Sequence, residues 1–322
     1  MEISATQDLI SDDIEAVDTL IEAGLASDVN LIGELSKHLI YSGGKRLRPL
    51  LVLLSAKSLG YEGINHHRLA AVIEFVHTAT LLHDDVVDTS ALRRGQETAN
   101  VIWGNAASVL VGDFLYSRAF QLMVQVQNLR VLDVLAHATN VISEGEVKQL
   151  THCKDPETTE EDYFAIIRAK TAMLFSAGTE VGALIATEDE KIIQSMANYG
   201  EQLGIAFQLV DDILDYTGDA DTIGKNIGDD LAEGKPTLPL IYALHQSSGA
   251  DKTLLENCIR HGGADQLPAV LRVIESTKAI DYTKQRAKTA HQQALTALDV
   301  LPDSPYKTAL ADLADFSVSR AF

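Results

Sequence analysis

Residues 84–88 of the chain read DDVVD, and residues 211–215 read DDILD. On a helix, side chains four positions apart lie on one face, so the first and last aspartates of each segment stand together while the second points partly aside. We call these segments the first and the second aspartate motif. Each motif is expected to present a pair of carboxylates on one helix face.

Both motifs follow apolar residues, Leu81 and Leu82 before the first and Leu209 and Val210 before the second. Unpaired carboxylates repel each other and are costly to remove from water, so cations are expected between the motifs. Oxygen ligands without cysteine or clustered imidazole favour a hard ion, and Mg²⁺ commonly shares its coordination shell with substrate phosphates. The repeat therefore predicts a shared magnesium site and a diphosphate substrate. A single copy could equally be a solvated helix face, but such a face does not need apolar flanks.

The rest of the chain predicts a bundle of helices. Of its 322 residues, 46% are hydrophobic but only 6% are aromatic, and Ala and Leu outnumber runs of β-branched residues. No segment competes convincingly as a strand, and the segment 218–234, rich in Gly, Asp and Lys, is interpreted as a mobile active-site loop. The sequence thus predicts one all-α domain over residues 1–322 with a central cavity. Helices are predicted at 6–25, 28–41, 46–60, 66–89, 97–127, 130–152, 159–187, 190–217, 235–246, 251–262, 267–276, 278–299 and 304–319.

Charge and composition narrow the partners and the location. The formal net charge of −20 argues against nucleic acid, so phosphate binding must depend on local basic clusters and metal ions. Cys153 and Cys258 lack metal-ligand spacing and fit a reducing compartment, where both pack in the interior. The acidic N-terminus shows no secretory signal, and no apolar run approaches the roughly 18 residues of a membrane-spanning helix. We therefore expect a soluble, cytoplasmic protein without stable membrane insertion.

Basic residues cluster at two places that suit a diphosphate. Residues 43–49 read GGKRLRP, in which the glycines permit close backbone approach and the bases begin a helix whose free N–H groups favour anions. Arg93 and Arg94 follow the first aspartate motif, and their proximity to Asp88 suits a bidentate grip on phosphate. Alternatively, the glycines end one helix, solvated bases open the next, and the two arginines neutralise the acidic turn.

Further bases lie near the second aspartate motif and within a helix. Lys225 and Lys235 bracket an acidic pair in and after the predicted loop, and Lys170 followed by Thr171 lies within an otherwise apolar helix. A buried lysine needs an anion nearby. These lysines are the remaining candidates for contacts with a diphosphate.

Taken together, these segments resemble the trans-isoprenyl diphosphate synthases. The likeness covers about residues 30–245 and is carried, in the family's order, by GGKRLRP at 43–49, HDDVVD at 83–88, RRG at 93–95, KT at 170–171 and FQLVDDILD at 207–215. The bacterial long-chain members, octaprenyl diphosphate synthases above all, are resembled by GNAA at 104–107, GD at 112–113 and GKPTLPL at 234–240. The resemblance implies a helical fold of the isoprenoid synthase type, a homodimer, and a prenyltransferase that condenses isopentenyl diphosphate units onto an allylic diphosphate such as farnesyl diphosphate. Its product would supply a quinone side chain.

The resemblance also implies roles for individual residues. In the family's reaction, an allylic diphosphate ionises, the carbocation alkylates isopentenyl diphosphate, and the departing pyrophosphate takes the proton in a dry cavity. About three Mg²⁺ ions would be held by Asp84, Asp88 and Asp211, with Asp85, Asp212 and Asp215 as direct or indirect helpers. The allylic diphosphate would contact Arg93, Lys170, Lys225 and Lys235. Isopentenyl diphosphate would contact Lys45, Arg48, Arg94 and His77, although a lone histidine such as His77 is more often a core residue. Thr171 and Gln208 would turn their oxygens toward the carbocation.

Other classes of protein fit the sequence less well. A class I terpene cyclase would share the first aspartate motif, but it would carry an Asn/Ser/Glu metal triad in place of the second and would lack the basic segment 43–49. A metal phosphohydrolase built on His83 and Asp84 with upstream histidines would leave the second motif unexplained. A non-catalytic subunit would be expected to have lost one motif, and both are intact. A synthase of shorter or longer chains is the nearest alternative.

The product length is predicted from the helix that leads to the first aspartate motif. The growing tail would run back along this helix, past the residues five and four before Asp84, which are Ala79 and Thr80. Both are small, whereas short-chain members of the family often place an aromatic residue there, so the tail can pass. Phe120 and Met123, three apart on a predicted helix, could form the floor, although each could equally be a core residue. We expect products of about forty carbons.

Overall fold

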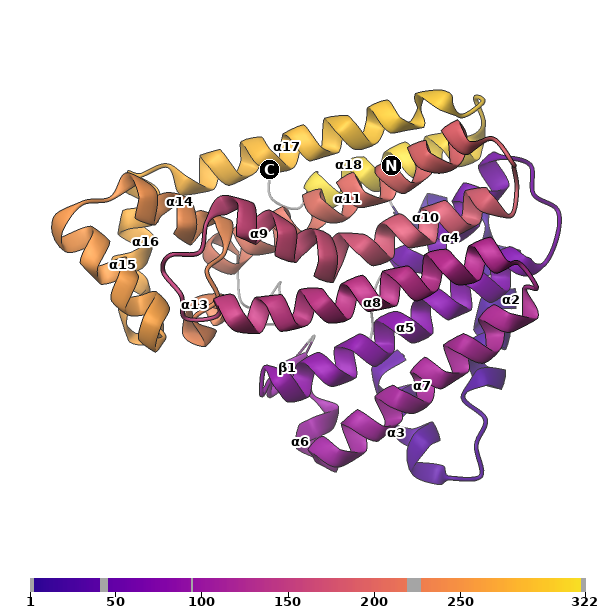
Figure 1. The fold of residues 1–322 in the computed structure, drawn as a ribbon, viewed down its shortest axis with the longest axis horizontal. Coiled ribbons are helices and arrows are strands. Elements are labelled where there is room, and N and C mark those ends of the chain that lie inside the picture. Colours follow the sequence, from indigo (N-terminus) through magenta and orange to yellow (C-terminus); the bar gives the residue numbers. More distant parts are fainter. Residues whose placement is uncertain (1–2, 41–45, 94, 219–226, 320–322) are drawn as a thin grey trace. The chain divides into compact units, whose positions relative to one another are not determined.

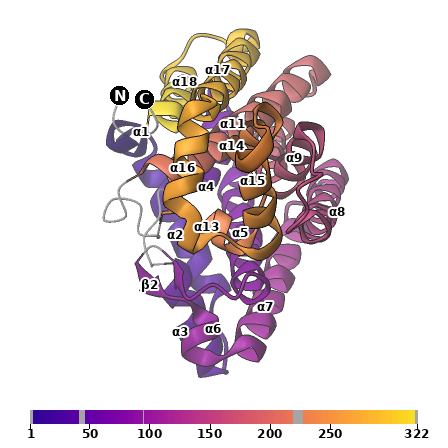
Figure 2. The ribbon, with the colours of Figure 1, turned by 90° about the vertical axis from the view of Figure 1, so that its left-hand side faces the viewer.

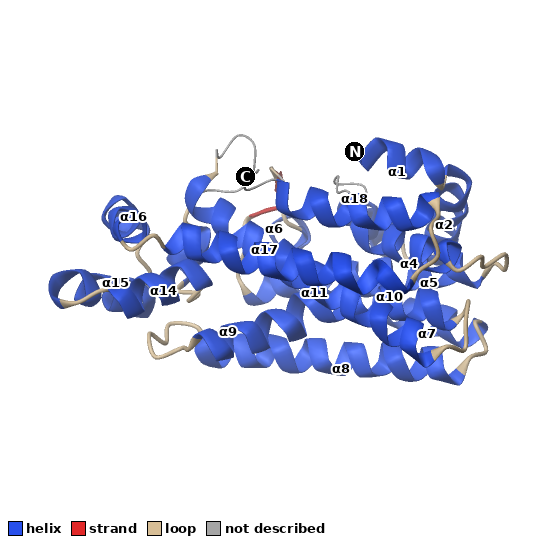
Figure 3. Cartoon of the chain, turned by 90° about the horizontal axis from the view of Figure 1, so that it is seen from above, coloured by secondary structure: helices blue, strands red, loops and turns tan. Residues whose placement is uncertain are grey.

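The computed structural model describes residues 3–40, 46–93, 95–218 and 227–319, and nearly all of them are helical. Figure 3 shows blue helices throughout, with red strand confined to a short segment. The predicted all-α class is therefore confirmed. The chain divides into two compact units. The first unit comprises residues 1–139, 174–200 and 295–313, and the second comprises 140–173, 201–294 and 314–322.

The helices are distributed over both units. The first unit contains α1 (Ile3–Leu9), α2 (Ser11–Gly24), α3 (Asn30–Ile40), α4 (Leu47–Ser58), α5 (Asn65–Val87), α6 (Ala99–Trp103), α7 (Asn105–Gln125) and the 3₁₀ turn η3 (Leu298–Val300). The second contains α9 (Glu160–Ile167), the π-helix η1 (Arg168–Ala172), α13 (Asp229–Glu233), α14 (Leu238–Gln246), α15 (Gly249–His261), the 3₁₀ turn η2 (Ala264–Gln266) and α16 (Leu267–Ser276). Residues of both units occur in α8 (Leu129–His152), α10 (Met173–Leu184), α11 (Glu190–Thr217), α17 (Ala279–Ala297) and α18 (Pro305–Ser319).

Two predicted helices are broken near their N-terminal ends. The prediction of one helix over 6–25 is wrong at Ile10, which separates α1 from α2 in a non-helical conformation. The prediction over 97–127 is wrong at Gly104, where a φ of 84° separates α6 from α7. A side chain at this φ would be strained, so glycine permits the break.

A two-stranded antiparallel sheet follows the first aspartate motif, although no strand was predicted. Strand β1 (Leu92–Arg93) pairs with β2 (Gln96–Glu97), and Leu92 lies opposite Glu97. Gly95, in the turn, has a φ of 75°, which suits a tight hairpin. Strands of two residues are too short to show the alternating hydrophobicity that predicts strands, so the sequence pattern could not reveal them.

Helix α5 forms the centre of the first unit. Its residues Leu69, Ile73 and Leu82 have no exposed surface, and it packs against α2, α4 and α7 (Figure 1). Burial of each such side chain contributes about 1.5–3 kcal/mol. Helix α2 approaches closely because Gly24 lacks a side chain, since a Cβ atom there would lie 2.6 Å from the Phe75 ring. This packing supports the first aspartate motif, which lies at the C-terminal end of α5.

The hairpin is tied to a neighbouring helix of the same unit. Figure 2 shows α3 and α6 close to β2, and α3 contacts both α6 and α7. The Nε2 atom of His38, in α3, lies 2.9 Å from the backbone oxygen of Glu97 in β2, and the His38 ring meets Trp103 edge to face. These contacts hold the hairpin that follows the first aspartate motif.

The part of α11 from Glu201 onward contributes to the hydrophobic core of the second unit. Its fully buried residues Leu209 and Val210 belong to a hydrophobic cluster that includes Tyr163, Phe164 and Ile241, from α9 and α14. This cluster supports the second aspartate motif, which lies near the C-terminal end of α11. Among the described helices, none combines the length and apolar character that a bilayer-spanning segment requires.

Candidate active site

The first aspartate motif lies in the last turn of α5. Asp84 and Asp88 are half-buried, whereas Asp85 has no exposed surface. Arg93, from β1, neutralises Asp85, because its Nη2 and Nε atoms lie 2.7 and 3.0 Å from Oδ1. This pairing was the alternative interpretation of the sequence, in which the arginine neutralises the acidic turn. The structure thus gives the Arg93 guanidinium a carboxylate partner inside the motif.

Asn100 closes the end of α5 and was missed in the sequence. Its Nδ2 atom donates to the backbone oxygens of Asp85 and Ser90, at 3.1 and 3.2 Å. The last carbonyl groups of a helix lack partners within the helix, so a side-chain amide that donates to them stabilises the helix end. No sequence signal pointed to Asn100, because its partners precede it by ten and fifteen residues.

The second aspartate motif contains a buried carboxylate that neutral groups hold. Asp212 is 1% exposed, and the Tyr163 hydroxyl donates to its Oδ2 atom at 2.5 Å while Gln208 Nε2 donates to Oδ1 at 2.8 Å. Burial and the negative charge of Asp230 raise the pKa of Asp212 to about 8. Sequence reasoning missed Tyr163, which lies 49 residues before its partner and reads as an ordinary core aromatic.

Asp215, at the end of the second motif, has a carboxylate oxygen that lacks a hydrogen-bond donor among the described residues. Its Oδ2 atom is buried and accepts no hydrogen bond from any described residue. Burial and the carboxylates of Asp230 and Asp212 raise the pKa of Asp215 to about 8, although the Asp230 backbone N–H donates to it. A divalent cation would satisfy such an oxygen and offset the repulsion, and an all-oxygen site suits Mg²⁺. The residues present therefore fit the predicted metal.

The π-helix η1 carries Lys170 and Thr171, so the continuous α-helix predicted over 159–187 is wrong at this point. Lys170 Nζ lies 2.7 Å from Glu146 Oε2 and 2.6 Å from Gln149 Oε1, both in α8. Lys170 thus has a carboxylate partner, although it is half-buried and not fully buried as expected. Glu146 and Gln149 were not singled out in the sequence, although their spacing of three residues places them on one face of α8.

Thr171 meets Gln208 through its hydroxyl. Its Oγ1 atom donates to Gln208 Oε1 at 2.9 Å, so the two residues predicted to share a role lie in contact. A π-helical turn inserts an extra residue into the helix and is frequent at functional sites. Here it lies next to α8, because Gly145 lacks a side chain and a Cβ atom there would lie 2.7 Å from Ala169 Cβ.

Lys235 lies just after the segment that was predicted to be a mobile loop. Within 218–234, residues 229–233 instead form the helix α13, and the backbone N–H of Lys235 donates to the Asp230 oxygen at 2.8 Å. Its Nζ atom lies 2.6 Å from Glu233 Oε2. The prediction of a loop throughout this segment is therefore wrong for α13. Three predicted phosphate contacts lie outside the described residues, namely Lys45, Arg94 and Lys225.

Arg48 and His77 lie together in the first unit, as their predicted common role requires. The Arg48 Nη1 atom is 3.1 Å from His77 Nε2, and the guanidinium lies 4.3 Å from the centre of the Phe175 ring. Contact with an aromatic face holds the guanidinium plane in place. Arg46, from the same basic segment, instead pairs with Asp18 of α2 and ties α4 to that helix.

The predicted chain-length residues differ in exposure. Ala79 is fully buried, and the Thr80 hydroxyl donates to the His77 backbone oxygen at 2.8 Å. Met123 is 1% exposed, but Phe120 is 37% exposed and its ring lies beside that of Tyr116 in α7. Met123 thus faces the interior of its unit, whereas Phe120 is partly exposed, and their role as a floor for the product stays a prediction.

The two histidines furthest upstream of the first aspartate motif in α5 have a partner in α2. His66 and His67 direct their Nε2 atoms to Asp13 Oδ1, at 3.0 and 2.8 Å, and Lys57 Nζ lies 3.3 Å from the same oxygen. The two imidazoles and the ammonium group stabilise the Asp13 carboxylate, and their contacts connect α2 with α4 and α5. His83 contacts a backbone oxygen of α7 at 3.2 Å. The phosphohydrolase alternative, which needs imidazoles at the metal, is thus not supported.

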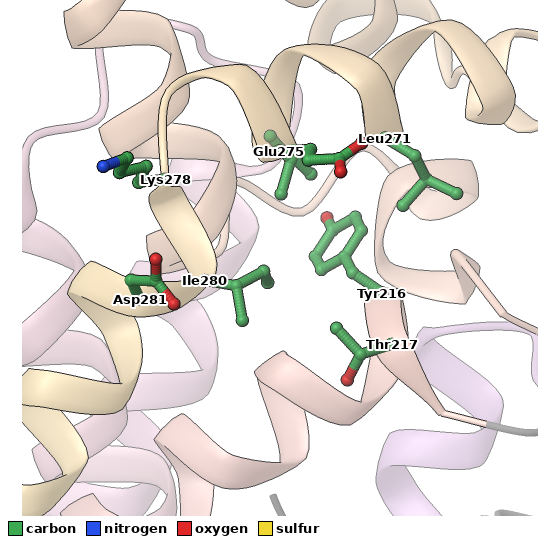
Figure 4. A pocket seen from close by; sticks show the side chains of 8 residues that line it. Tyr216, Thr217, Leu271, Glu275, Lys278, Ile280 and Asp281 are labelled. Atoms are coloured by element: carbon green, nitrogen blue, oxygen red, sulfur yellow. The ribbon is translucent and has the colours of Figure 1, made fainter. Parts of the chain in front are cut away.

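A pocket of about 360 Å³ lies beside the end of α11 (Figure 4). It is lined by Tyr216, Thr217, Leu271, Ile274, Glu275, Lys278, Ile280 and Asp281. Its lining carries two carboxylates and a single ammonium group, so its charge does not suit a diphosphate. The pocket therefore adds no residue to the predicted substrate sites.

The chain is similar to known proteins over its whole length. A family model described as polyprenyl synthetase matches residues 29–274. The octaprenyl diphosphate synthase of Haemophilus influenzae is 48% identical over 323 residues, which cover 100% of this chain and 98% of that protein. The solved structure of a decaprenyl diphosphate synthase from Rhodobacter capsulatus has a TM-score of 0.95 and 45% identity, with 100% of both chains covered. A polyprenyl synthase from Caulobacter crescentus CB15, solved with calcium and isoprenyl diphosphate, has a TM-score of 0.96 and 44% identity, with 100% of this chain and 98% of that chain covered.

Proposed function

The chain belongs to the polyprenyl synthetase family and is a prenyltransferase, and on that premise we propose that it makes octaprenyl diphosphate. In this reaction it lengthens an allylic diphosphate, such as farnesyl diphosphate, by successive isopentenyl diphosphate units. The observation that carries the proposal is the 48% identity, over the full chain, with an octaprenyl diphosphate synthase. A decaprenyl synthase is almost as similar, so the chain length has to be measured.

We propose that Asp84, Asp88, Asp211 and Asp215 hold about three Mg²⁺ ions together with the allylic diphosphate. The ions would supply Lewis-acid stabilisation of the leaving pyrophosphate. The buried Oδ2 atom of Asp215, with its raised pKa, supports a cation at this motif. Asp85 and Asp212 act indirectly in this proposal, because Arg93 and Tyr163 already hold them. Calcium in the Caulobacter crescentus structure supports a divalent site in the family.

The basic residues would bind the two diphosphates at separate places. Arg93, Lys170, Lys225 and Lys235 are proposed for the allylic substrate. Three of these bases have carboxylate partners in the structure, which a diphosphate would replace or share. Isopentenyl diphosphate would bind without metal to Lys45, Arg48, His77 and Arg94. The contact between Arg48 and His77 supports their common site.

The reacting carbon would lie near Thr171 and Gln208. The allylic C–O bond breaks and leaves pyrophosphate, the carbocation takes the electron pair of the isopentenyl double bond, and pyrophosphate removes the proton that restores a double bond. Oxygen atoms stabilise a developing cation, and exclusion of water protects it from hydrolysis. The contact of Thr171 with Gln208 supports a shared role.

We also propose that the two units act as one catalytic domain in a cytoplasmic homodimer. The family match spans residues 29–274 and therefore includes parts of both units. Helices α6 and α7 expose large apolar side chains that a second subunit could cover, among them Val101, Ile102, Leu110 and Val124.

The test is chromatographic sizing of products made from farnesyl diphosphate and isopentenyl diphosphate with Mg²⁺. We expect the product ladder to end near about forty carbons. A ladder that ends at fifteen to twenty carbons, or no extension at all, would contradict the proposal. Light scattering or sedimentation of the same sample tests the dimer.

A further inference from the structure

Four side chains of the second unit form an unbroken series of hydrogen bonds. The Tyr163 hydroxyl donates to Asp212 Oδ2 at 2.5 Å, and Asp212 Oδ1 accepts from Gln208 Nε2 at 2.8 Å. At the other end of the Gln208 amide, Oε1 accepts from Thr171 Oγ1 at 2.9 Å. The series connects a core tyrosine of α9 to the hydroxyl on the π-helix η1.

The chemistry of these groups gives the series a direction. While Asp212 is ionised, its Oδ1 atom can only accept, so the nitrogen end of the Gln208 amide has to face it. The oxygen end of that amide consequently faces Thr171. Because the threonine donates its proton to Gln208, its oxygen lone pairs point elsewhere. An amide turned by 180° would place N–H groups toward Thr171 and leave Asp212 facing an oxygen.

We propose that Tyr163 is a positioning residue for the prenyl transfer, which fixes through Asp212 the end of the Gln208 amide that faces the reacting carbon. This inference rests on the proposed roles of Thr171 and Gln208. An oxygen near the carbocation stabilises it, whereas the hydrogen atoms of an NH₂ group in the same place repel it. The orientation of the Gln208 amide therefore decides whether it stabilises or destabilises the carbocation.

Tyr163 is suited to act from a distance. Its side chain is 4% exposed and lies in the hydrophobic cluster behind α11, so it holds Asp212 from the interior. Its ring meets Phe164 edge to face, with 5.4 Å between ring centres, which restricts the direction of the hydroxyl. Asp212 is thereby held by a rigid partner.

A second buried tyrosine serves as a matched control, which distinguishes positioning of Gln208 by the Tyr163 hydroxyl from a general effect on stability. Tyr199 is also buried, and its hydroxyl donates to the Leu310 backbone oxygen at 2.7 Å in the first unit. Tyr163→Phe and Tyr199→Phe each remove one buried hydrogen bond. If Tyr163 positions Gln208, only Tyr163→Phe lowers kcat, by roughly tenfold, and the KM of each substrate changes by less than about twofold. Equal kcat values for the two variants would overturn the proposal.

A double-mutant cycle on the full-length enzyme tests the route. Gln208→Leu removes the amide, so Tyr163→Phe should lower kcat no further in that background, whereas additive losses would overturn the proposal. Asp212→Asn can hold either amide end and is expected to lower kcat like Tyr163→Phe. An Asp212→Asn variant with wild-type kcat would also overturn it.

The same variants separate this inference from the proposed function. If Thr171→Val and Gln208→Leu both keep wild-type kcat, the roles of these two residues in the proposed function are wrong. If both variants lose activity while Tyr163→Phe does not, those roles stand and only the positioning by Tyr163 is rejected.

Discussion

The two aspartate motifs have nearly the same sequence but different surroundings. In the first, the buried Asp85 pairs with the charged Arg93, so an arginine already offsets one of its carboxylates. In the second, the buried Asp212 is held by the neutral groups of Tyr163 and Gln208, and Asp215 has an oxygen without a donor among the described residues. Among the described residues, no basic side chain pairs with Asp212 or Asp215, and burial and repulsion from neighbouring carboxylates raise the pKa values of both to about 8.

This difference shows that a repeated motif need not bind a cation in the same way twice. A carboxylate paired with arginine gains little more from a metal ion, whereas carboxylates with pKa values raised to about 8 gain much from one. We therefore expect the second motif to depend more on divalent ions for its stability, while both motifs are needed for turnover.

The largest effect is expected from removal of the metal-binding aspartates. Asp84→Ala and Asp211→Ala should each lower kcat by about a thousandfold, because charge on the leaving pyrophosphate is no longer stabilised. Circular dichroism should show an unchanged helical content. Excess chelator should abolish wild-type activity, and wild-type rates in chelator would contradict the proposed metal site.

The next largest effect is expected on stability, when the ion pair between Arg93 and Asp85 in the first motif is broken. Arg93→Met should destabilise the fold by about 3 kcal/mol, because it leaves Asp85 charged and buried without a partner. The matched change in the second motif, Tyr163→Phe, should cost only about 1 kcal/mol, because it removes a neutral donor. Unfolding in denaturant measures both losses of stability. Similar losses in the two variants would contradict the proposed difference between the motifs. The double variant Arg93→Met with Asp85→Leu should recover most of the stability.

The pH dependence of stability tests the second motif in the metal-free protein. The pKa of Asp215 is raised in the fold from 3.8 to about 8, so the folded state binds a proton more tightly than the unfolded state. Its favourable contribution is complete below the unfolded pKa and is lost as the pH rises toward 8. Melting curves in chelator should therefore fall over this range, and Asp215→Asn should flatten the fall. Added Mg²⁺ should raise the melting temperature more at pH 8 than at pH 6.

Substitutions of the basic residues should each weaken the binding of only one of the two substrates. Arg48→Ala should raise the KM for isopentenyl diphosphate by about tenfold, and Lys235→Ala that for the allylic diphosphate, because each loses a charged hydrogen bond to phosphate. Steady-state kinetics with each substrate varied in turn measures this. Equal effects on both substrates would show that the two sites are not distinct.

A substitution at Ala79 is expected to change the reaction rate least but to change the length of the products. Only the first motif is preceded by two small residues, since Ala206 and Phe207 occupy the matching positions before Asp211. Ala79→Tyr should block the tail and shorten products to about fifteen or twenty carbons. Misfolding would lower all products together, so a shortened ladder is specific. An unchanged ladder would show that the tail takes another path, and Met123→Ala should lengthen the products.

Much of the fold and the candidate site could be predicted from local patterns. The helical periodicity identified most helices, and Arg48 with His77, and Thr171 with Gln208, were assigned to common sites before the structure showed them in contact. The hairpin and the π-helix could not be predicted, because two-residue strands and one widened turn leave no periodic signal. The exposure of Phe120 was also missed, since a spacing of three residues does not say which face is buried.

The sequence by itself determined the helical class and the two aspartate motifs, because amphipathic periodicity and carboxylate spacing are properties of neighbouring residues. Only the tertiary structure decided which charges are compensated. Arg93 reaches Asp85 through a hairpin, Lys170 meets Glu146 of another helix, and Tyr163 meets Asp212 from 49 residues away. Such partners are brought together by packing, and their burial makes a pairing with arginine differ from a pairing with tyrosine.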